Sequence, residues 1–239
     1  MLKQDISRRT DKTEIMDDFD LKGPELRKTL SDLDNINSWL GGNQITLDGI
    51  KELLKGHSKN KKIKIVDIGC GNGSILRKVA AWGKSQKREF ILIGIDANEH
   101  AIQIAKEKSK KFENLSFEKL NIFSDSFKSN QYDIILCTLT LHHFKDKEII
   151  SLLNQLYTQA KLGIVINDLH RSNSAYILFQ AFCSVFVNNE IARKDGLTSI
   201  LRGFKRSDLL RYQEDISCSS FKISWKWAFR YQWIIKKEQ

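Results

Sequence analysis

A strand-like run that ends in three closely spaced glycines is the first place where this sequence could do chemistry. The run reads IKIVDIGCGNG from Ile63 to Gly73, with β-branched residues in its first half. Glycine accepts positive φ angles and lets the backbone approach a ligand closely. Helical spacing of apolar residues starts at Ser74, so free N–H groups and the positive end of a helix dipole would face the glycines. This stretch therefore predicts a site for a polar, nucleotide-like ligand.

A carboxylate at the end of the next strand-like run, Phe90 to Asp96, could serve the same ligand. Asp96 follows Gly69 by 96 − 69 = 27 positions, a little more than the roughly 20 positions between the glycine turn and the ribose-binding acid of dinucleotide folds. A carboxylate at the tip of a neighbouring strand can still accept hydrogen bonds from both hydroxyls of a ribose. We therefore expect Asp96 to bind a ribose.

The glycines and Asp96 meet only if their strands end at the same edge of one sheet. Strand-like and helix-like segments alternate from residue 63 to residue 167, which predicts a mainly parallel sheet, covered by helices, with ligands over the carboxyl ends of its strands. Two further strands, 221–227 and 229–235, are joined by a turn so short that they must pair antiparallel. Between them and the parallel strands we expect a helix over 176–186, a loop-rich connection over 188–204, and a helix over 208–215 capped by Ser207.

The residues before the sheet, 1–58, are predicted to form an arm and a helical cap, with residues 59–239 forming the ligand-binding domain. Residues 1–20 mix charges with few apolar side chains, so we expect them to gain order only by contact with the rest of the chain. Apolar residues recur every three or four positions from Leu26 to Leu40, which predicts an amphipathic helix, and a short helix follows over 45–54. This cap would either cover the ligand as a lid or brace the sheet.

The composition is that of a globular protein, and we expect the protein to be cytoplasmic. No apolar run reaches the ~20 residues of a membrane-spanning helix, and the longest one, Ala175 to Val187, is interrupted by Gln180 and Ser184. The four cysteines form no CxxC pair, and neither a zinc site nor any other metal site is predicted. The net charge of +10 favours anionic partners, but the lysines are dispersed, so a solvated basic surface is expected and a nucleic-acid site is not.

Taken together, these features resemble the class I S-adenosylmethionine-dependent methyltransferases. The resemblance rests on VDIGCGNG, on the acid that ends the second strand, on YDIILCTLTLHHF and on the antiparallel hairpin, and it covers about Lys61 to Lys237. The glycine spacing is GxGxG, unlike the GxGxxG of dehydrogenases. The family implies an α/β, Rossmann-like sandwich with a seven-stranded, mainly parallel sheet. It also implies S-adenosyl-L-methionine as methyl donor and S-adenosyl-L-homocysteine as product.

The resemblance also assigns residues to the cofactor. Asp67 and the glycine stretch would hold its methionine part, Asp96 its ribose, and Ala97 would lie near adenine. Asn121 stands where the family usually has an acid, and its amide oxygen can accept the same hydrogen bond. The full expected set is Asp67, Gly69, Cys70, Gly71, Gly73, Asp96, Ala97, Asn121, Ile122 and Thr138.

Methyl transfer to a hydroxyl is helped by a general base, and histidine is the commonest one. His142, His143 and His170 all follow strand ends on the ligand side of the predicted sheet. Asp168 and His170 are two positions apart, so in an extended chain they project to one side and could interact. We therefore predict His170, His142 and Asp168 as catalytic residues, although each histidine could equally serve the fold.

Within the family, the small-molecule branch with the quinone-ring and polyketide O-methyltransferases looks closest, because it shares HHF after the fourth strand and a helical N-terminal cap. The NPPY-type tetrapeptide of amino-methylating enzymes is absent. A small, partly apolar acceptor is expected, contacted by His143, Arg171 and Arg202, and the chain would be a monomer or a homodimer. An RNA or protein methyltransferase and a non-enzymatic scaffold are the alternatives.

The C-terminal strands are rich in aromatic residues that alternate with polar or basic ones. This period is typical of a strand that buries one face, so we expect the aromatic side chains to pack in the core and not to stack on bases. The residues concerned are Trp225, Trp227, Phe229, Tyr231 and Trp233.

Overall fold

The computed structural model describes residues 4–216, 218 and 220–237. Its strands are β1 Ile63–Ile68, β2 Phe90–Asp96, β3 Leu115–Lys119, β4 Tyr132–Thr138, β5 Ala160–Leu169, β6 Phe221–Lys226 and β7 Arg230–Lys236. Its helices are η1 Ile15–Asp17, α1 Gly23–Trp39, α2 Gly42–Leu53, α3 Ser74–Ser85, α4 Glu99–Lys108, α5 Asp125–Lys128, η2 Leu141–His143, α6 Asp146–Gln159, α7 Asn173–Phe186, α8 Glu190–Arg202 and α9 Arg206–Glu214.

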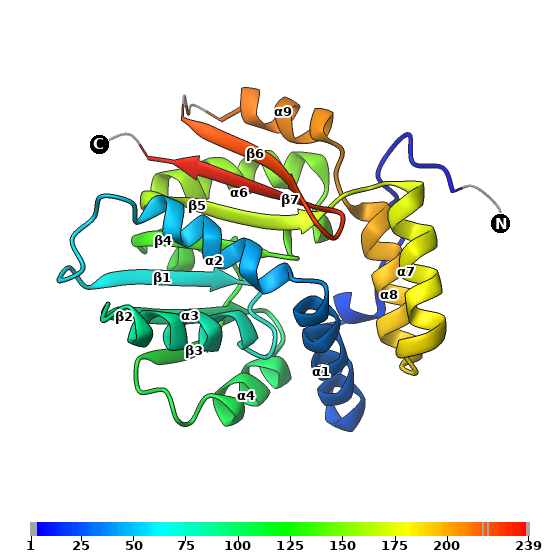
Figure 1. Cartoon of the computed structure of the whole chain (residues 1–239), viewed down its shortest axis with the longest axis horizontal. Helices are drawn as coiled ribbons and strands as arrows, with labels where there is room; N and C mark the ends of the chain where they lie inside the picture. The colour runs from blue at the N-terminus through cyan, green and yellow to red at the C-terminus, as the bar shows by residue number, and fades with distance from the viewer. Residues whose placement is uncertain (1–3, 217, 219, 238–239) are drawn as a thin grey trace.

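The strands form one seven-stranded sheet in the order β3-β2-β1-β4-β5-β7-β6 (Figure 1). Strands β1 to β5 pair in parallel, and β7 pairs antiparallel with both β5 and β6. The predicted α/β sandwich with an antiparallel C-terminal hairpin is thus confirmed. All parallel strands end at one edge, which is where the predicted ligand site must lie.

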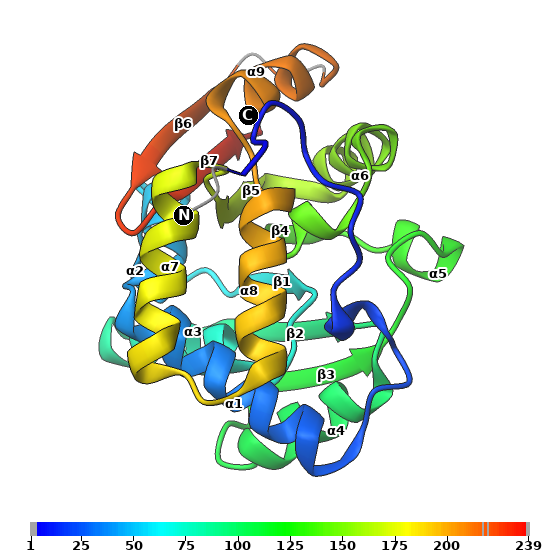
Figure 2. The ribbon, with the colours of Figure 1, turned by 90° about the vertical axis from the view of Figure 1, so that its right-hand side faces the viewer.

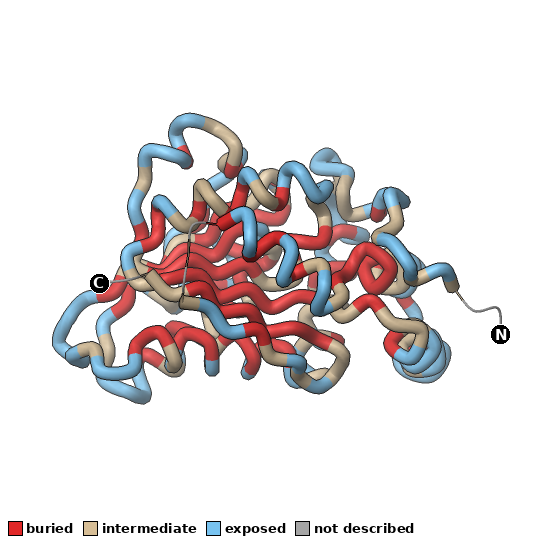
Figure 3. The backbone as a smooth tube through the Cα atoms, turned by 90° about the horizontal axis from the view of Figure 1, so that it is seen from above, coloured by how far each residue is buried: buried red, intermediate tan, exposed pale blue. Residues whose placement is uncertain are grey.

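Each face of the sheet has its own core, because successive side chains of a strand point to opposite faces. In β1, Ile63 and Ile65 pack with α2, α3 and α4, whereas Val66 and Ile68 pack with α5, α6 and α9. The buried strands therefore run through the middle of the molecule between two helical layers (Figure 3). Among the described residues, no helix is both long and apolar enough to cross a membrane.

The sequence left open whether the cap braces the sheet or covers the ligand site, and the two cap helices differ in this respect. Helix α2 braces the sheet, since its Ile50 and Leu53 are buried in the core with β1 and β5. Helix α1 instead lies over the glycine stretch, where the Asn72 side-chain amide donates a hydrogen bond to the Leu30 carbonyl over 3.1 Å. The cap is therefore partly a brace and partly a cover.

The expectation of a loop-rich connection over 188–204 is wrong, because residues Glu190–Arg202 form helix α8. Its N-terminus is capped by the Asn189 side chain, which accepts a hydrogen bond from the Ala192 N–H over 3.1 Å. Gly196, which disfavours a helix on its own, lets α8 pack closely on Phe179 of α7: a Cβ at this position would stand 2.5 Å from the ring. Tertiary packing therefore overrides the weak local propensity.

Smaller differences concern α9, β3 and the C-terminal aromatic residues. Helix α9 starts at Arg206 and is capped by Asp208, whose carboxylate accepts from the Lys205 N–H over 2.8 Å, so Ser207 is not its cap. Strand β3 ends at Lys119, so Asn121 lies beyond the end of the strand. Tyr231 and Trp233 are buried as predicted, but Trp225, on the edge strand β6, and Trp227, in the turn that follows it, are exposed.

The substitution Gly196→Val tests the close packing of α7 on α8. We expect it to lower the free energy of unfolding by about 1–3 kcal/mol, because the added side chain meets the Phe179 ring. The gain in helix propensity of Val over Gly is only roughly a few tenths of a kcal/mol and does not offset this. Urea denaturation gives the measurement, with the exposed Arg193→Ala on the same helix as a control expected within about 0.5 kcal/mol. An unchanged or raised stability of Gly196→Val would contradict the packing argument.

Candidate active site

The glycine stretch turns sharply from β1 into α3 and contacts the segment that follows β4. Gly69, Gly71 and Gly73 have φ angles of +68°, +52° and +74°, which favour glycine. A Cβ on Gly69 would stand 2.4 Å from Oγ1 of Thr140. Thr140 Oγ1 in turn donates a hydrogen bond to the Ile68 carbonyl over 3.2 Å. The glycine stretch and the β4–α6 connection therefore form one continuous wall at the carboxyl edge of the sheet.

Two carboxylates lie at the base of this wall. Asp96 accepts hydrogen bonds from the Gly71 and Asn98 N–H groups, both over 2.9 Å. Asp67 is buried, and its Oδ1 has no hydrogen-bond partner among the described residues. Burial, and then the charge of Asp96, raises the pKa of Asp67 well above its ordinary value. A buried, unsatisfied carboxylate is costly, so this site favours a ligand that brings a positive charge or a hydrogen-bond donor.

The other predicted cofactor residues are distributed around the same edge. Ala97 follows Asp96 and is half-buried, while Ile122 is buried against α6, and its carbonyl accepts from Gln155 over 2.8 Å. Asn121 is exposed beyond the end of β3, and its amide oxygen accepts from the Phe123 N–H over 2.9 Å.

Thr138, the last residue of β4, is hydrogen-bonded to Thr46 of α2 through the two hydroxyls, 3.1 Å apart. The sequence missed Thr46, which also accepts from Asn167 of β5 over 3.0 Å. Helix α2 is thus tied to the carboxyl edge of the sheet as well as to its core.

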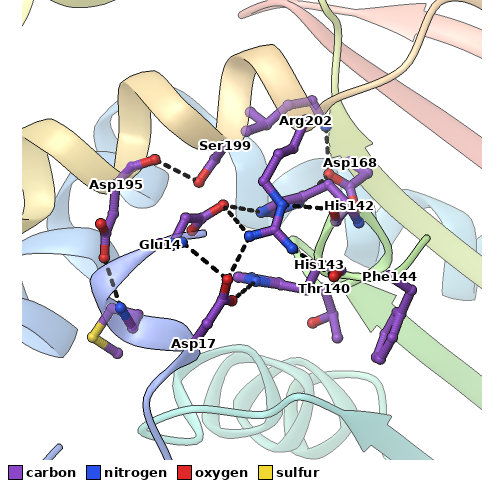
Figure 4. Close-up of polar contacts among 12 residues, drawn as sticks. Glu14, Asp17, Thr140, His142, His143, Phe144, Asp168, Asp195, Ser199 and Arg202 are labelled. Atoms are coloured by element: carbon purple, nitrogen blue, oxygen red, sulfur yellow. Dashed lines mark hydrogen bonds and ion pairs between the residues drawn. The ribbon is translucent and has the colours of Figure 1, made fainter. Parts of the chain in front are cut away.

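A buried histidine between two carboxylates lies beside this wall (Figure 4). Nδ1 of His142 lies 2.7 Å from Oδ1 of Asp168, and its Nε2 lies 3.5 Å from Oε1 of Glu14. All three side chains are almost completely buried. Burial alone would lower the pKa of His142, but Asp168 and Glu14 outweigh it and raise the pKa to about 9. Burial would raise the pKa values of both acids, yet the hydrogen bond of Asp168 with His142 and the attraction of Glu14 to the same imidazole hold them below the ordinary value.

His143 and Asp17 form a second histidine–carboxylate pair, and Arg202 of α8 contacts the acids of both pairs. Nδ1 of His143 lies 2.6 Å from Oδ1 of Asp17, and Arg202 pairs with the other oxygen of Asp17. Arg202 also donates to the carbonyls of His142 and His143, and its guanidinium lies 3.6 Å from Glu14. The predicted substrate contacts His143 and Arg202 therefore bind acids of this chain. We name Glu14, Asp17, His142, His143, Asp168 and Arg202 the buried ion cluster.

Two acids of the buried ion cluster come from the N-terminal arm, residues 4–20, which the sequence left without a role. Arg9 anchors the arm by donating to the carbonyls of His142, Phe144 and Arg202 and by pairing with Asp146 over 2.9 Å. Further along, the N–H groups of Ile15 and Met16 donate to Asp195 of α8. Polar contacts thus hold the arm across the end of the sheet. A short charged stretch gives no sequence signal for such a position.

His170 and Arg171 do not have the surroundings that the sequence predicted. Asp168 contacts His142, not His170, whose Nδ1 instead accepts from Nε1 of Trp225 over 3.2 Å. Burial, followed by the charges of Arg171 and Lys205, lowers the pKa of His170. Arg171 is buried and bonded to the Ile6 and Gly203 carbonyls and to Asp208. The donors of Arg171 are thus engaged by groups of this chain next to the start of α7.

The cluster offers ligand atoms for a cation, yet it carries its own positive charge. One atom each from Glu14, His142 and His143 lie within 4.8 Å of one another. Arg202 lies among them, and the raised pKa of His142 puts a proton on that imidazole at neutral pH. Arg202 and His142 thus offset part of the negative charge of the three acids within the protein.

Comparison with known protein families identifies the family of this chain. The sequence profile of the methyltransferase domain family matches residues 59–232, well over half of the chain. This chain belongs to that family. The match begins just after the cap helices and includes the glycine stretch, Asp96 and both histidines of the buried ion cluster.

Several named proteins are similar to this methyltransferase. A ubiquinone biosynthesis O-methyltransferase of Rickettsia canadensis is 30% identical over 139 residues, which cover 57% of this chain and 56% of that protein. This chain thus spans about half the length of that relative. A carboxy-S-adenosyl-L-methionine synthase of Helicobacter pylori is 24% identical over 180 residues, covering 71% and 73%. The plantazolicin methyltransferase BpumL, solved in complex with SAH, has a TM-score of 0.66 at 21% identity over 90% and 91% of the two chains, which shows a shared fold.

The raised pKa of His142 predicts a loss of stability in mildly alkaline solution. A group whose pKa is higher in the folded chain stabilises the fold below its unfolded value, and this stabilisation disappears as the pH rises through the folded value. For His142 these values are 6.5 and about 9. We expect the free energy of unfolding to fall by on the order of 2 kcal/mol across this range.

Urea denaturation at several pH values measures the loss, and His142→Gln should remove this part of the pH dependence. NMR of the imidazole provides a second measurement that does not depend on how well the variant folds. The chain has five histidines, so the His142 signal can be assigned by its absence in the variant. An imidazole that titrates at or below 6.5 would contradict the prediction.

Proposed function

We propose that this methyltransferase transfers a methyl group from S-adenosylmethionine to a hydroxyl of a small, partly apolar acceptor. The observation that carries the proposal is the unpartnered, buried Oδ1 of Asp67 beneath a glycine turn, beside Asp96. In this proposal, residues 59–239 bind the cofactor and residues 1–58 complete the acceptor side. The similarity to ubiquinone biosynthesis O-methyltransferases supports a hydroxyl as the methylated group.

The chain's own residues fit the cofactor in charge and in hydrogen bonding. Bound S-adenosylmethionine would supply a methyl group on a positively charged sulfur. Asp67 would face its cationic methionine end, and Asp96 retains lone pairs for two ribose hydroxyls, since each oxygen accepts one N–H from the chain. The remaining contacts would come from Gly69, Cys70, Gly71, Gly73, Ala97, Asn121, Ile122 and Thr138.

We propose the pair of His142 and Asp168 as the general base, in preference to His170. With Nδ1 of His170 accepting from Trp225, a neutral imidazole carries its proton on Nε2 and has no lone pair left to take another. In His142 the Asp168 carboxylate holds the Nδ1 proton, so a neutral imidazole would present the Nε2 lone pair. The acceptor oxygen would bond to the methyl carbon while the methyl–sulfur bond breaks and its electron pair stays on the sulfur, and Nε2 would take the proton of the acceptor hydroxyl.

This role requires Glu14 to leave Nε2 of His142 when the acceptor binds. Glu14 is one of the two carboxylates that raise the pKa of His142. Moving it away removes part of that stabilisation of the imidazolium, so the imidazole can lose its proton nearer to neutral pH. Because Glu14 lies on the N-terminal arm, the arm would open to admit the acceptor.

Thermal unfolding with S-adenosylhomocysteine tests the cofactor part of the proposal. At about one hundred times its Kd, a ligand adds about 2.7 kcal/mol to the folded state, which raises the Tm of a chain of this size by roughly 5–10 °C. Asp96→Ala should weaken binding at least ~10-fold, since it removes the ribose acceptor. Asp48→Ala, an exposed acid of α2, is the control. A wild-type Tm that does not move with millimolar ligand would overturn the cofactor assignment.

Turnover of the two histidine variants tests the base. The acceptors are phenols and catechols with alkyl tails of increasing length, and the readout is the formation of S-adenosylhomocysteine. His142→Gln should lower kcat about 100-fold with little change in cofactor affinity, whereas His170→Gln should retain most of the activity. The reverse order of the two variants would remove His142 from this role.

A further inference from the structure

Helix α7 presents an apolar face to solvent. Its fourteen residues, Asn173–Phe186, include no charged side chain, and only Ala175 and Cys183 are buried. The exposed neighbours Ile177 and Leu178 are followed at helical spacing by the exposed Ala181 and Val185, so the four side chains form one stripe. Leu178 is 52% exposed and Val185 70%. A surface helix of a globular protein normally has its polar side facing outward, so this face needs an explanation.

Aromatic side chains extend the stripe toward α1. Phe182 and Phe186 of α7 lie with ring centroids 5.1 Å apart, and Phe182 meets Trp39 edge-on at 6.3 Å. Trp39 ends α1 and is 63% exposed. A cavity of about 210 Å³ opens between Trp39, Phe186 and Lys28. The apolar surface is thus continuous from α7 to the end of α1.

The tip of the β6–β7 hairpin adds two tryptophans beside the start of α7. Both views of the molecule place this tip next to the N-terminal half of α7, which is the outermost element at that end (Figures 1 and 2). Trp225 donates to His170, three residues before α7 begins, and Trp227 is 66% exposed. We name Ile177, Leu178, Ala181, Val185, Phe186, Trp39, Trp225 and Trp227 the α7 face.

Positive charges surround the α7 face. Lys28 lines the cavity beside Trp39, and Nζ of Lys78 donates to Ser38, the neighbour of Trp39, over 3.3 Å. Arg193 lies close enough to Cys183 of α7 for its charge to act on the pKa of that thiol, and Lys226 lies between Trp225 and Trp227.

The acids nearby are already engaged by this chain. Asp32 accepts from Asn189 over 3.0 Å, and Glu190 pairs with Lys194 over 2.7 Å. With a net charge of +10 for the whole chain, the α7 face and its surroundings offer apolar contact together with positive charge.

We propose that the α7 face docks this methyltransferase on the surface of an anionic lipid bilayer. Helix α7 would lie in the plane of the interface with its apolar stripe among the acyl chains, the mode of an interfacial helix. Trp39, Trp225 and Trp227 would sit at headgroup level, where the indole ring is favoured. The basic residues would contact anionic headgroups, since each basic residue near such a surface contributes attraction that salt screens. This inference stands on the surface alone and does not depend on the acceptor or on the catalytic base.

Sedimentation with lipid vesicles tests the docking. The full chain is mixed with vesicles of equal parts phosphatidylglycerol and phosphatidylcholine, and separately with vesicles of phosphatidylcholine alone. We expect the bound fraction to be high on the anionic vesicles, low on the neutral ones, and reduced when the salt is raised from about 0.05 M to about 0.5 M. No binding to the anionic vesicles would overturn the proposal.

Matched variants locate the contact. Val185→Asp should weaken vesicle binding at least ~10-fold, because it removes apolar burial and adds a repelled charge. Leu210→Asp, an exposed leucine on α9 at another part of the surface, should bind like the wild type. Val185 is 70% exposed, so the Tm of Val185→Asp should stay close to that of the wild type, and the Tm of Leu210→Asp, at a position 36% exposed, is measured beside it.

Equal binding of the Val185→Asp variant and the wild type would overturn the assignment of the contact to α7. Sedimentation velocity without lipid tests the alternative that a second copy of this chain packs on the α7 face. A dimer that Val185→Asp dissociates, with no vesicle binding by the wild type, would replace the bilayer by a protein interface.

Discussion

The position of His142 between Asp168 and Glu14 is the constraint on which the proposed acceptor site depends. Charges taken out of water are costly unless each is paired and hydrogen-bonded. Asp168 belongs to β5, Glu14 to the arm, and Arg202, which pairs with the arm's other acid, to α8. Three segments far apart in the chain are therefore fixed against one another by one set of charges, so a change of charge at His142 would affect all of them.

The proposed cofactor site is built differently, mainly from the backbone. Positive φ angles at Gly69 and Gly73 shape the turn, and close approach of Thr140 makes a side chain at position 69 impossible without rearrangement. Asp67 and Asp96 supply the few charged groups there. This end is held by the core of the sheet on both faces, whereas the arm is held by polar contacts. The proposed cofactor site thus has a shape fixed by the core, whereas the proposed acceptor site is bounded by an arm that polar contacts hold in place.

The sequence predicted the features that local pattern determines. Buried strands, the glycine turn and Asp96 follow from runs of β-branched residues, from glycine spacing and from the common edge of parallel strands. Helix α8 could not be predicted, because Gly196 opposes a helix until Phe179 packs on it. The burial of Glu14 beside His142 could not be predicted either, because an acid in a charged arm gives the same sequence pattern whether it is solvated or buried. The partner of Asp168 is His142, 26 residues earlier in the chain, and only tertiary structure selects it over a histidine two positions away.

The exposed apolar side chains of the C-terminal hairpin also bear on function. Alternation in the C-terminal strands correctly placed Trp233 in the core but not Trp227, because Trp227 lies in the turn between β6 and β7, outside the alternating pattern of the strands. Strand β5 carries Asp168 near its end and leads through His170 directly into α7. The proposed base and the proposed bilayer contact therefore lie at the same end of the sheet. If both proposals hold, an apolar acceptor dissolved in lipid would have a short path to His142, and the arm that covers this histidine would be the segment it displaces.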